Sequence, residues 1–515
     1  MKKRFLFLFL LFGFIINIAS CNSTDKAYPF KYAITGNPKT LDPQCALNDN
    51  SDAVIHTVFQ GLFTFGENGE IENGMIDSFH ISEDGTIWTF NIKPGIYWSD
   101  GDEFSAECTA EDFVFGFQRL FRPATKSECA ADYFIIKNSE AVNSGAVSDI
   151  SLLGVRAIDK YTLEIVLNEP CSDFMSLLAL PPAMPCNQEF FESTQGRYGL
   201  AADCVASNNG YYVHTWNYDK WSDEGNYIIL RRNTLNQYSA DSPYTINLFI
   251  DPVNERKDFD EEILNVYKGK DYKEITELHR TYKSDEYETA VWGLIFNTKG
   301  NFSSHNYRLE LSAATEFTAS DERYKAFNGI IPYSVITGQG SYRDIVGDLN
   351  SVISSAKGVG TLSGMRMIMP SGTGLRTDIG KILQKWQSEC GFYCSISELD
   401  SSEYTSALEN GDFDIALVKL TGEYNSPYAY LNDFLTGNSA NYGNYENQKY
   451  SHIINSALSS NDSTASSVYY KEAEQLLIDS GIFVPLCIET EYVFYKEKLE
   501  TICYNPFSGV YSIKG

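Results

Sequence analysis

The side chains most often used in catalysis and metal binding form no recognisable motif in this 515-residue chain. The segment GTGLRTDIGKI resembles a phosphate loop, but five residues separate Gly374 from Gly380 and an isoleucine follows Lys381, so it is not a Walker motif. There is no GxSxG elbow. The histidines lack metal-ligand spacing such as HExxH; they stand at positions 56, 80, 214, 279, 305 and 452. We therefore expect a protein that is not an enzyme and that needs no metal or cofactor.

The cysteines leave two alternatives open. Ten of the eleven remain once Cys21 is set aside, an even number that suits disulfides in an exported protein. Cys390 and Cys394 form a CxxxC pair that closes only if the intervening glycine bends the chain, and no second pair or histidine nearby suggests zinc. Buried free thiols are the alternative for all ten, because connectivity cannot be read from sequence.

One loop in the C-terminal half is the best place to look for a ligand. The segments MRMIMP, TDIGKILQKWQSEC, YCSISEL, SEYTSALEN and DFDIALVKL alternate between strand and helix patterns, which predicts a parallel sheet covered on both faces, and hence an α/β domain. Ligands of such sheets bind beyond the carboxyl ends of strands. The loop after DFDIALVKL carries Glu423, although a lone acid in a loop is more often a solvated surface charge.

The first third of the chain reads as strands with interspersed helices. TIWTFNI alternates in the manner of a half-buried strand. TAEDFVFGFQRLF predicts a helix with Thr109 as its N-cap and Asp112 at the capping-box position. GVRAIDKYTLEIVL predicts a hairpin that ends before Pro170.

Length and charge limit the class of protein. A chain of 515 residues is too long for one ordinary core, so two or three domains are expected. The formal net charge of −28 opposes binding to phosphate backbones, and we expect no nucleic-acid partner.

The N-terminus predicts export. Lys2, Lys3 and Arg4 precede the apolar run FLFLFLLFGFII, which is too short to be a permanent membrane span and predicts a signal peptide over residues 1–20. The following IASC resembles a bacterial lipobox, which implies lipid on Cys21, a tether over 21–27, and a location on the extracytoplasmic face of the bacterial cell membrane. An ordinary secretory signal with an incidental cysteine is the alternative.

The order of motifs along the chain resembles the peptide-binding proteins of ABC importers, the oligopeptide and dipeptide permease family (family 5 periplasmic binding proteins). The resemblance spans nearly all of the mature chain and rests on TLDPQ, FQGLFTF, WTFNIKPGIYWSDG, TAEDFVFGFQRL, LLGVRAIDKYTLEIVLNEP, NNGYYV, LIFNT, ALENGDFDIAL and YYKEAEQLLIDSGIFVPL. Single pieces are weak, but their joint order and spacing are specific.

The resemblance implies an α/β, periplasmic-binding-protein-like fold (type II, cluster C): a two-lobed clamp with an inserted, extra β-rich domain. The implied domains are a discontinuous lobe I over 28–55, 168–250 and 488–515, an inserted domain II over 56–167, and an α/β lobe III over 251–487. The implied partners are an oligopeptide, held as an extended chain between the lobes, and a membrane permease with separate ATPase subunits. A monomer is expected.

The resemblance also implies a peptide-binding site around the predicted loop. Relatives use an aspartate in a segment like ADYNEP to hold the peptide ammonium, and GEYNSP places Glu423 at the matching position. An enclosed ammonium needs such a counter-charge. The neighbouring residues carried into the site are Leu420, Tyr424, Asn425 and Tyr442. No partner for the peptide carboxylate is located; the candidates are Arg366, Arg376 and Lys419.

Departures from the family pattern keep other functions open. Leu420 replaces an aromatic residue of some relatives, and Tyr211 replaces a common proline in NGPY. A nickel chelate, an oligosaccharide or another small solute is therefore an alternative ligand. A peptide-signal receptor, or a secreted hydrolase with an unrecognised site, is an alternative of a different class.

Overall fold

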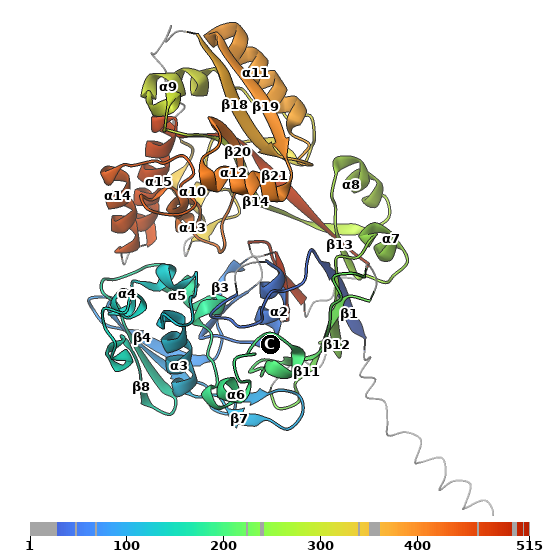
Figure 1. Ribbon diagram of the computed structural model, residues 1–515, viewed down its shortest axis with the longest axis vertical. Coiled ribbons are helices and arrows are strands. Elements are labelled where there is room, and N and C mark those ends of the chain that lie inside the picture. The colour runs from blue at the N-terminus through green and yellow to red at the C-terminus, as the bar shows by residue number, and fades with distance from the viewer. Residues whose placement is uncertain are drawn as a thin grey trace, which may run out of the picture.

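The computed structural model describes residues 28–46, 49–66, 69–222, 225–236, 242–337, 340–349, 361–460, 463–496, 502–507 and 509–513. The predicted signal peptide, Cys21 and the tether lie outside these residues. Figure 1 shows a large sheet with its helices at one end of the molecule, and two smaller sheets with their helices at the other.

The first small sheet joins the start of the described chain to its middle. Its strand order is β1 (Pro29–Ile34), β12 (Thr245–Ile250), β11 (Tyr227–Arg232) and β10 (Tyr211–Asn217), with β1 parallel to β12 and the other pairs antiparallel. The C-terminal hairpin of β22 (Ile502–Asn505) and β23 (Val510–Ile513) packs here, since the Tyr511 ring centroid lies 4.9 Å from that of Tyr32. Helix α2 (Asp49–Val58) contacts β23.

The second small sheet is antiparallel, in the order β4 (Ile76–Ile81), β5 (Ile87–Ile92), β9 (Thr162–Val166) and β8 (Val155–Asp159). The predicted strand and hairpin are thus confirmed. The predicted helix is α3 (Ala110–Phe121), and the Thr109 N–H donates to the Asp112 carboxylate at 2.7 Å as a capping box requires. Arg119 of α3 is buried against Asp42 and donates to Gln44 Oε1 at 2.7 Å, which ties the N-terminal segment to this helix.

The large sheet contains the predicted strand and helix alternation. Its path is β13 (Val266–Lys268), β21 (Phe483–Tyr495), β14 (Lys283–Phe296), β20 (Ile415–Thr421), β18 (Leu362–Pro370) and β19 (Phe392–Leu399), and β15 (Tyr324–Ala326) pairs with β21. β18 is parallel to β19 and β20, as predicted. β14 is antiparallel to both β20 and β21, so the sheet as a whole is mixed, although the three strands predicted from the sequence are parallel.

The helices of the large sheet begin and end close to the predicted positions. α11 (Arg376–Cys390) ends at Gly391 and α12 (Ser401–Asn410) at Gly411, both in the left-handed region at φ of +67° and +69°. The other helices of this half are α7 (Glu255–Asp260), α8 (Tyr272–Leu278), α9 (His305–Ala314), α10 (Tyr342–Val346), α13 (Pro427–Leu431), α14 (Gln448–Leu458) and α15 (Ser463–Ser480).

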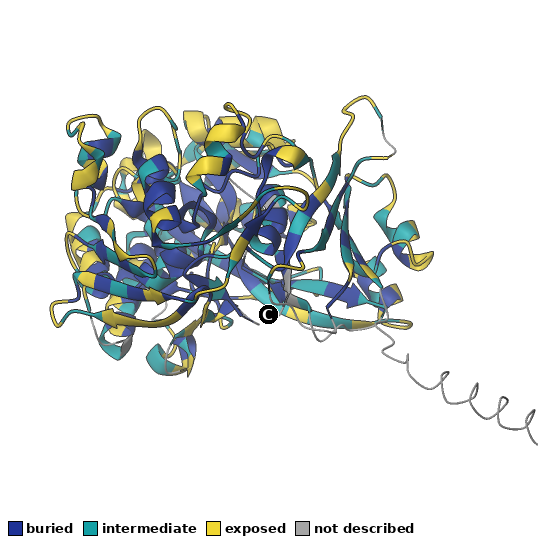
Figure 2. Ribbon diagram, turned by 90° about the horizontal axis from the view of Figure 1, so that it is seen from below, coloured by how far each residue is buried: buried dark blue, intermediate teal, exposed yellow. Residues whose placement is uncertain are grey.

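Shorter elements complete the molecule. They are β2 (Phe63–Phe65), β3 (Ile71–Asn73), β6 (Tyr97–Ser99), β7 (Ser105–Glu107), α4 (Ser139–Asn143), α5 (Phe174–Ala179), α6 (Gln188–Ser193), β16 (Ile336–Thr337) and β17 (Gly340–Ser341). Short 3₁₀ helices lie between them, including Ala130–Tyr133 and Asn432–Phe434. Buried residues run along the strands of the sheets, and exposed residues lie mainly on turns and outer helix faces (Figure 2).

The strand membership bears on the domain division, which stays a prediction. Segments assigned to lobe I at 28–55 and 168–250 contribute strands to one sheet. β21 continues across the assigned boundary at 487/488 as a single strand of the large sheet. Nine cysteines of the described chain are free thiols, among them Cys390 and Cys394.

Candidate ligand-binding site

A cavity of about 670 Å³ lies between the first small sheet and the large sheet. One wall is the end of β1 from Tyr32 to Thr35, with Asn50 beside it, and the opposite wall comes from β13, β14, β20 and β21. C-terminal residues Pro506, Phe507, Gly509 and Tyr511 contribute a third side. The cavity therefore contacts two sheets that are built from distant parts of the chain, as a site closed by two lobes requires.

Charged side chains line this cavity in pairs. The Lys419 Nζ lies 2.9 Å from Glu489 Oε2, which also accepts from the Trp292 indole N–H at 2.9 Å. The other pairs are Lys268 with Glu491 at 3.4 Å and Lys270 with Glu255 at 3.0 Å. Burial raises the pKa of Glu491, but Lys268 and the Tyr504 hydroxyl lower it more, so the net shift is downward. The lysines named here are thus already paired with glutamates, which suits a site that accepts peptides with different side chains.

Strand β20 presents alternate residues to the cavity. Lys419 and Thr421 line it, whereas Leu420 is 7% exposed and belongs to the hydrophobic core. Successive strand residues face opposite sides of a sheet, which explains the difference. The structure does not bring Leu420, one of the predicted binding residues, to this cavity.

The loop between β20 and α13 carries Glu423 as an exposed side chain. Gly422 precedes it because a Cβ there would lie 2.5 Å from the Tyr430 ring. The Glu423 carboxylate is near enough to Tyr133 and Asp433 to shift their pKa values. Burial and then the Glu423 charge raise the pKa of Asp433 to about 7. Glu423 therefore lies where α13 and the 3₁₀ helix Asn432–Phe434 approach the 3₁₀ helix Ala130–Tyr133.

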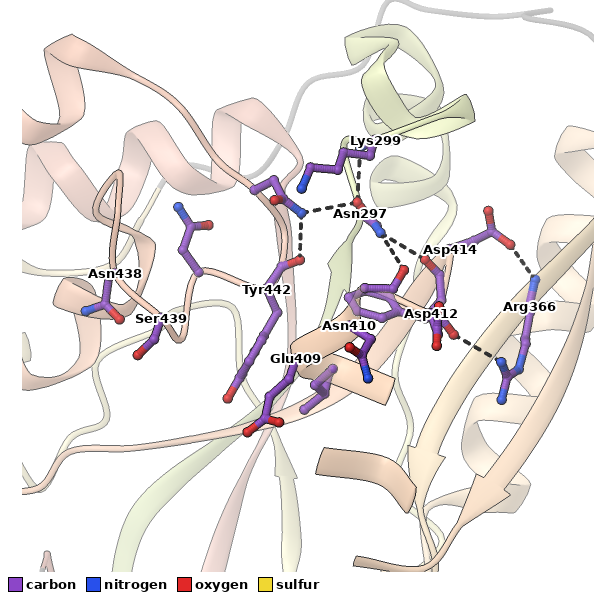
Figure 3. Close-up of a pocket in the computed structure, with 15 residues that line it drawn as sticks. Asn297, Lys299, Arg366, Glu409, Asn410, Asp412, Asp414, Asn438, Ser439 and Tyr442 are labelled. Atoms are coloured by element: carbon purple, nitrogen blue, oxygen red, sulfur yellow. Dashed lines mark hydrogen bonds between the residues drawn. The ribbon is translucent and has the colours of Figure 1, made fainter. Parts of the chain in front are cut away.

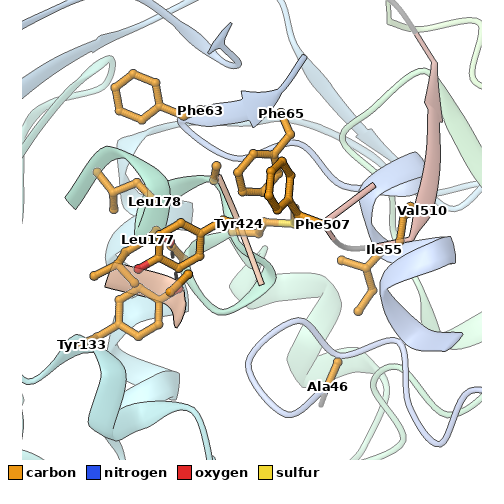
Figure 4. Packing of buried hydrophobic residues seen from close by; sticks show 14 of the residues in the cluster. Ala46, Ile55, Phe63, Phe65, Tyr133, Leu177, Leu178, Tyr424, Phe507 and Val510 are labelled. Carbon is orange, nitrogen blue, oxygen red and sulfur yellow. Dashed lines mark hydrogen bonds between the residues drawn. The ribbon is translucent and has the colours of Figure 1, made fainter. Parts of the chain in front are cut away.

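The two residues after Glu423 point into protein. Tyr424 is 3% exposed, and its ring packs beside Tyr133, Leu177 and Phe507 (Figure 4). Asn425 Oδ1 accepts from the Ile336 N–H at 2.8 Å. Of the three consecutive residues that the sequence placed in the site, only Glu423 has an exposed side chain.

Tyr442 lies at a different cavity, of about 680 Å³, beside the start of β20 (Figure 3). Asn297, Glu409, Asp412 and Arg366 also line it. The cavity between the sheets lies at the opposite end of β20, at Lys419 and Thr421. Glu423 is among the lining residues of neither cavity, so the structure does not bring Tyr442 and Glu423 together at one cavity.

The three candidate partners for a ligand carboxylate separate in the same way. Lys419 lines the cavity between the sheets. Arg366 lines the second cavity, where its guanidinium donates to the Asp412 carbonyl at 3.1 Å. Arg376 is half exposed and pairs with Glu398 at 3.1 Å. Of the three, only Lys419 is placed to meet a ligand held between the sheets.

Sequence reasoning missed most of the charged wall. Glu489 and Glu491 flank the buried Thr490, and this alternation in a segment rich in β-branched and aromatic residues is a strand signal that identifies them as same-face residues. Lys268 and Lys270 lie in the segment YKGKDY, which none of the motifs used in the sequence analysis covers.

The described residues add findings about metal binding, histidine ionisation and membrane insertion. No group of three or more His, Cys, Asp or Glu among them is placed to hold a metal ion. Burial lowers the pKa of His56 to about 4, so this histidine is neutral at physiological pH.

In the same described part of the chain, no helix has both the length and the apolar character needed to cross a bilayer.

Comparison with known proteins gives likenesses over nearly the whole chain. Residues 70–309 match the profile described as "Bacterial extracellular solute-binding proteins, family 5 Middle". The "Oligopeptide-binding protein OppA" of Bacillus subtilis is 25% identical over 562 residues, covering 99% of each chain. The "Probable deoxycholate-binding periplasmic protein YgiS" of Escherichia coli is 22% identical over 518 residues, covering 94% of this chain and 92% of the relative.

A solved structure shows the same fold. The substrate-binding domain of an oligopeptide ABC transporter from Bacillus anthracis superposes with a TM-score of 0.72 at 20% identity, covering 94% of this chain and 97% of that one. The α/β fold predicted from the sequence, a two-lobed clamp, is thereby confirmed.

Proposed function

We propose that this chain, which belongs to family 5 of the bacterial extracellular solute-binding proteins, is the receptor of a peptide importer. It captures an extended oligopeptide between its lobes and delivers it to a membrane permease that separate ATPase subunits power. Binding and release are its whole activity, without bond cleavage. The observation that carries the proposal is the cavity between the two sheets, with Glu423 on the loop that follows its β20 wall.

The chemistry of the cavity supports a peptide. Peptides of any sequence offer the same backbone donors and acceptors, and strand ends such as that of β1 supply matching groups. Ion pairs along the walls keep the lysines and glutamates satisfied before a ligand arrives. Specificity for a free amino terminus then rests on Glu423, and Lys419 is our candidate for the peptide carboxylate.

Closure around the ligand follows from the same arrangement. A ligand shifts a two-lobed protein toward its closed state only by contacts that are better in that state. A peptide that touches both β1 and β20 makes such contacts, whereas a ligand on one wall does not. We propose that the protein acts as a monomer anchored to the membrane by lipid on Cys21.

A mixed peptide pool tests this function. The purified protein is incubated with the pool and separated from unbound peptides, and the retained ligands are identified by mass spectrometry. We expect intact short peptides with free amino termini. Retention of no peptide, or recovery of cleaved products, contradicts the proposal.

A non-peptide solute is the second candidate. It is favoured by the likeness to a probable deoxycholate-binding protein and by Leu420, which lies in the core rather than in the cavity. The same pool experiment, repeated with bile salts, oligosaccharides and nickel chelates, separates the two candidates.

A further inference from the structure

The loop that carries Glu423 is fastened to a segment about 250 residues earlier in the chain. Ser426 is the N-cap of α13, and its hydroxyl accepts from the Tyr428 N–H at 3.1 Å. The same hydroxyl donates to the carboxylate of Asp173, which directly precedes α5. Beside this contact, the Ser172 N–H donates to the Leu458 carbonyl at the end of α14, at 2.7 Å. Two hydrogen bonds thus join the large-sheet half to the segment before α5.

Tyr424 adds an apolar contact to the same boundary. Its ring, two residues before Ser426, is buried among side chains from the other half of the molecule, including Tyr133, Leu177 and Phe507 (Figure 4). Glu423 directly precedes Tyr424, whose ring is inserted across the boundary. It is three residues before Ser426, which is hydrogen-bonded across the same boundary. The direction of Glu423 depends on how firmly residues 424–426 are held.

From this geometry we infer that Asp173 is a positioning residue of the ligand site, which holds the loop 422–426 so that Glu423 meets the ammonium of a bound peptide. The inference rests on the proposed function. Asp173 itself does not touch the peptide. It acts through Ser426, and the short link from Ser426 back to Glu423 transmits its effect.

The surroundings of Asp173 make the hold depend on pH. Asp173 is 9% exposed, and burial raises its pKa to about 6 although the Ser426, Ser172 and Tyr424 hydroxyls lower it. Tyr428, Tyr470 and Cys171 are the other titratable groups close to it. The Ser426 hydroxyl donates to the Asp173 carboxylate, so this hydrogen bond favours the ionised form of Asp173. Protonation of Asp173, as pH falls through about 6, should therefore weaken the bond from Ser426.

Affinity measurements on four proteins test the inference. A peptide that the wild-type protein retains from the pool is synthesised with a free and with an acetylated amino terminus, and both forms are titrated calorimetrically at several pH values from 5 to 7.5. We expect Asp173→Ala to reduce the preference for the free amine about tenfold. Ser426→Ala should do the same, and the double variant should lose little more, because both side chains belong to one contact.

The conservative variant separates positioning from simple structural support. Asn in place of Asp173 keeps an acceptor for Ser426, so Asp173→Asn should retain the preference within about twofold while the pH dependence of affinity between 7.5 and 5 flattens. Asp149→Ala is the matched control, since the exposed Asp149 also accepts from a serine hydroxyl, that of Ser151 at 2.7 Å, away from this boundary. It should change neither quantity.

Two outcomes contradict the inference and can be told apart. Thermal unfolding first establishes that Asp173→Ala is folded. If this variant keeps the wild-type preference for the free amine, or loses affinity equally for both peptide forms, Asp173 does not position Glu423, although the proposed function stands. If the wild-type protein retains no peptide from the pool, the proposed function fails and the positioning role fails with it.

Discussion

Two glutamates of this chain show how burial decides what a carboxylate does. Glu423 is exposed on a loop, and we propose that it binds the ammonium of a peptide. Glu474 on α15 is fully buried, and it accepts from the Ile330 and Ile331 N–H groups at 2.6 and 3.0 Å and from the Arg343 guanidinium. A buried carboxylate of this kind is stable only because its donors are in place.

Removal of the Glu474 charge should destabilise the protein strongly. In Glu474→Gln the buried Arg343 loses its counter-charge, and we expect the free energy of unfolding of this half to fall by about 3–5 kcal/mol in urea titrations. Glu472→Gln on the same helix is the control, since its pair with Lys449 is largely exposed, and it should cost less than about 1 kcal/mol. Equal effects of the two variants would contradict this account of Glu474.

At the scale of elements, glycine has opposite effects within one helix. Gly391 ends α11 at φ +67°, a conformation that other residues adopt at a cost of about 1 kcal/mol. Gly380 lies inside the same helix, and a Cβ there would meet nothing closer than Arg376 Nη1 at 3.9 Å. The same change to alanine should therefore destabilise the protein at one position and stabilise it at the other.

Thermal unfolding of the two variants tests this expectation. Gly391→Ala should lower the midpoint temperature and reduce the free energy of unfolding by about 1 kcal/mol. Gly380→Ala should raise the midpoint and increase the free energy of unfolding by about 0.5–1 kcal/mol, because alanine loses less backbone entropy on folding than glycine. Effects of the same sign at both positions would mean that these helix boundaries are wrong.

The local sequence pattern predicted those helices and strands that follow one another closely along the chain. β18, α11, β19, α12 and β20 follow one another within sixty residues, and their periodicity and glycine ends were sufficient to find them. β14 and β21 were missed because they pair with each other across about two hundred residues, and that pairing makes the sheet mixed. No local signal links these two segments.

The same limit applies to the site. Topology and motif pointed to the loop with Glu423, and the structure places that loop next to the β20 residues of the cavity. Asp173 could not be found in this way, because its importance arises only from contact with Ser426 in the folded chain. Leu420 was included because it matches a family position and Tyr442 because it is close in sequence, and neither reason decides the direction of a side chain.

At the scale of the whole molecule, binding and anchoring are separate properties. The cavity is formed by residues from Tyr32 onward, whereas the predicted lipid site, Cys21, precedes the described chain. Replacement of the thiol should thus leave the cavity unchanged and remove only the attachment to the membrane.

Fractionation of cells that express Cys21→Ser tests the anchor. We expect the variant to move from the membrane fraction to the soluble extracytoplasmic fraction or the medium, since a removed signal leaves nothing to hold it. Its affinity for peptides, measured on the purified protein, should match the wild type. A variant that stays with the membrane would contradict the lipid anchor.

The central claim is that a peptide held between the lobes is recognised by its ammonium at Glu423. Calorimetric titration of Glu423→Gln with free-amine and N-acetylated forms of one retained peptide tests it most directly, with Glu409→Gln, an exposed glutamate at the second cavity, as control. We predict at least tenfold weaker binding of the free amine, about 1.4 kcal/mol or more, and less than twofold change for the acetylated form. Equal loss for both forms, or no loss for either, would contradict the claim.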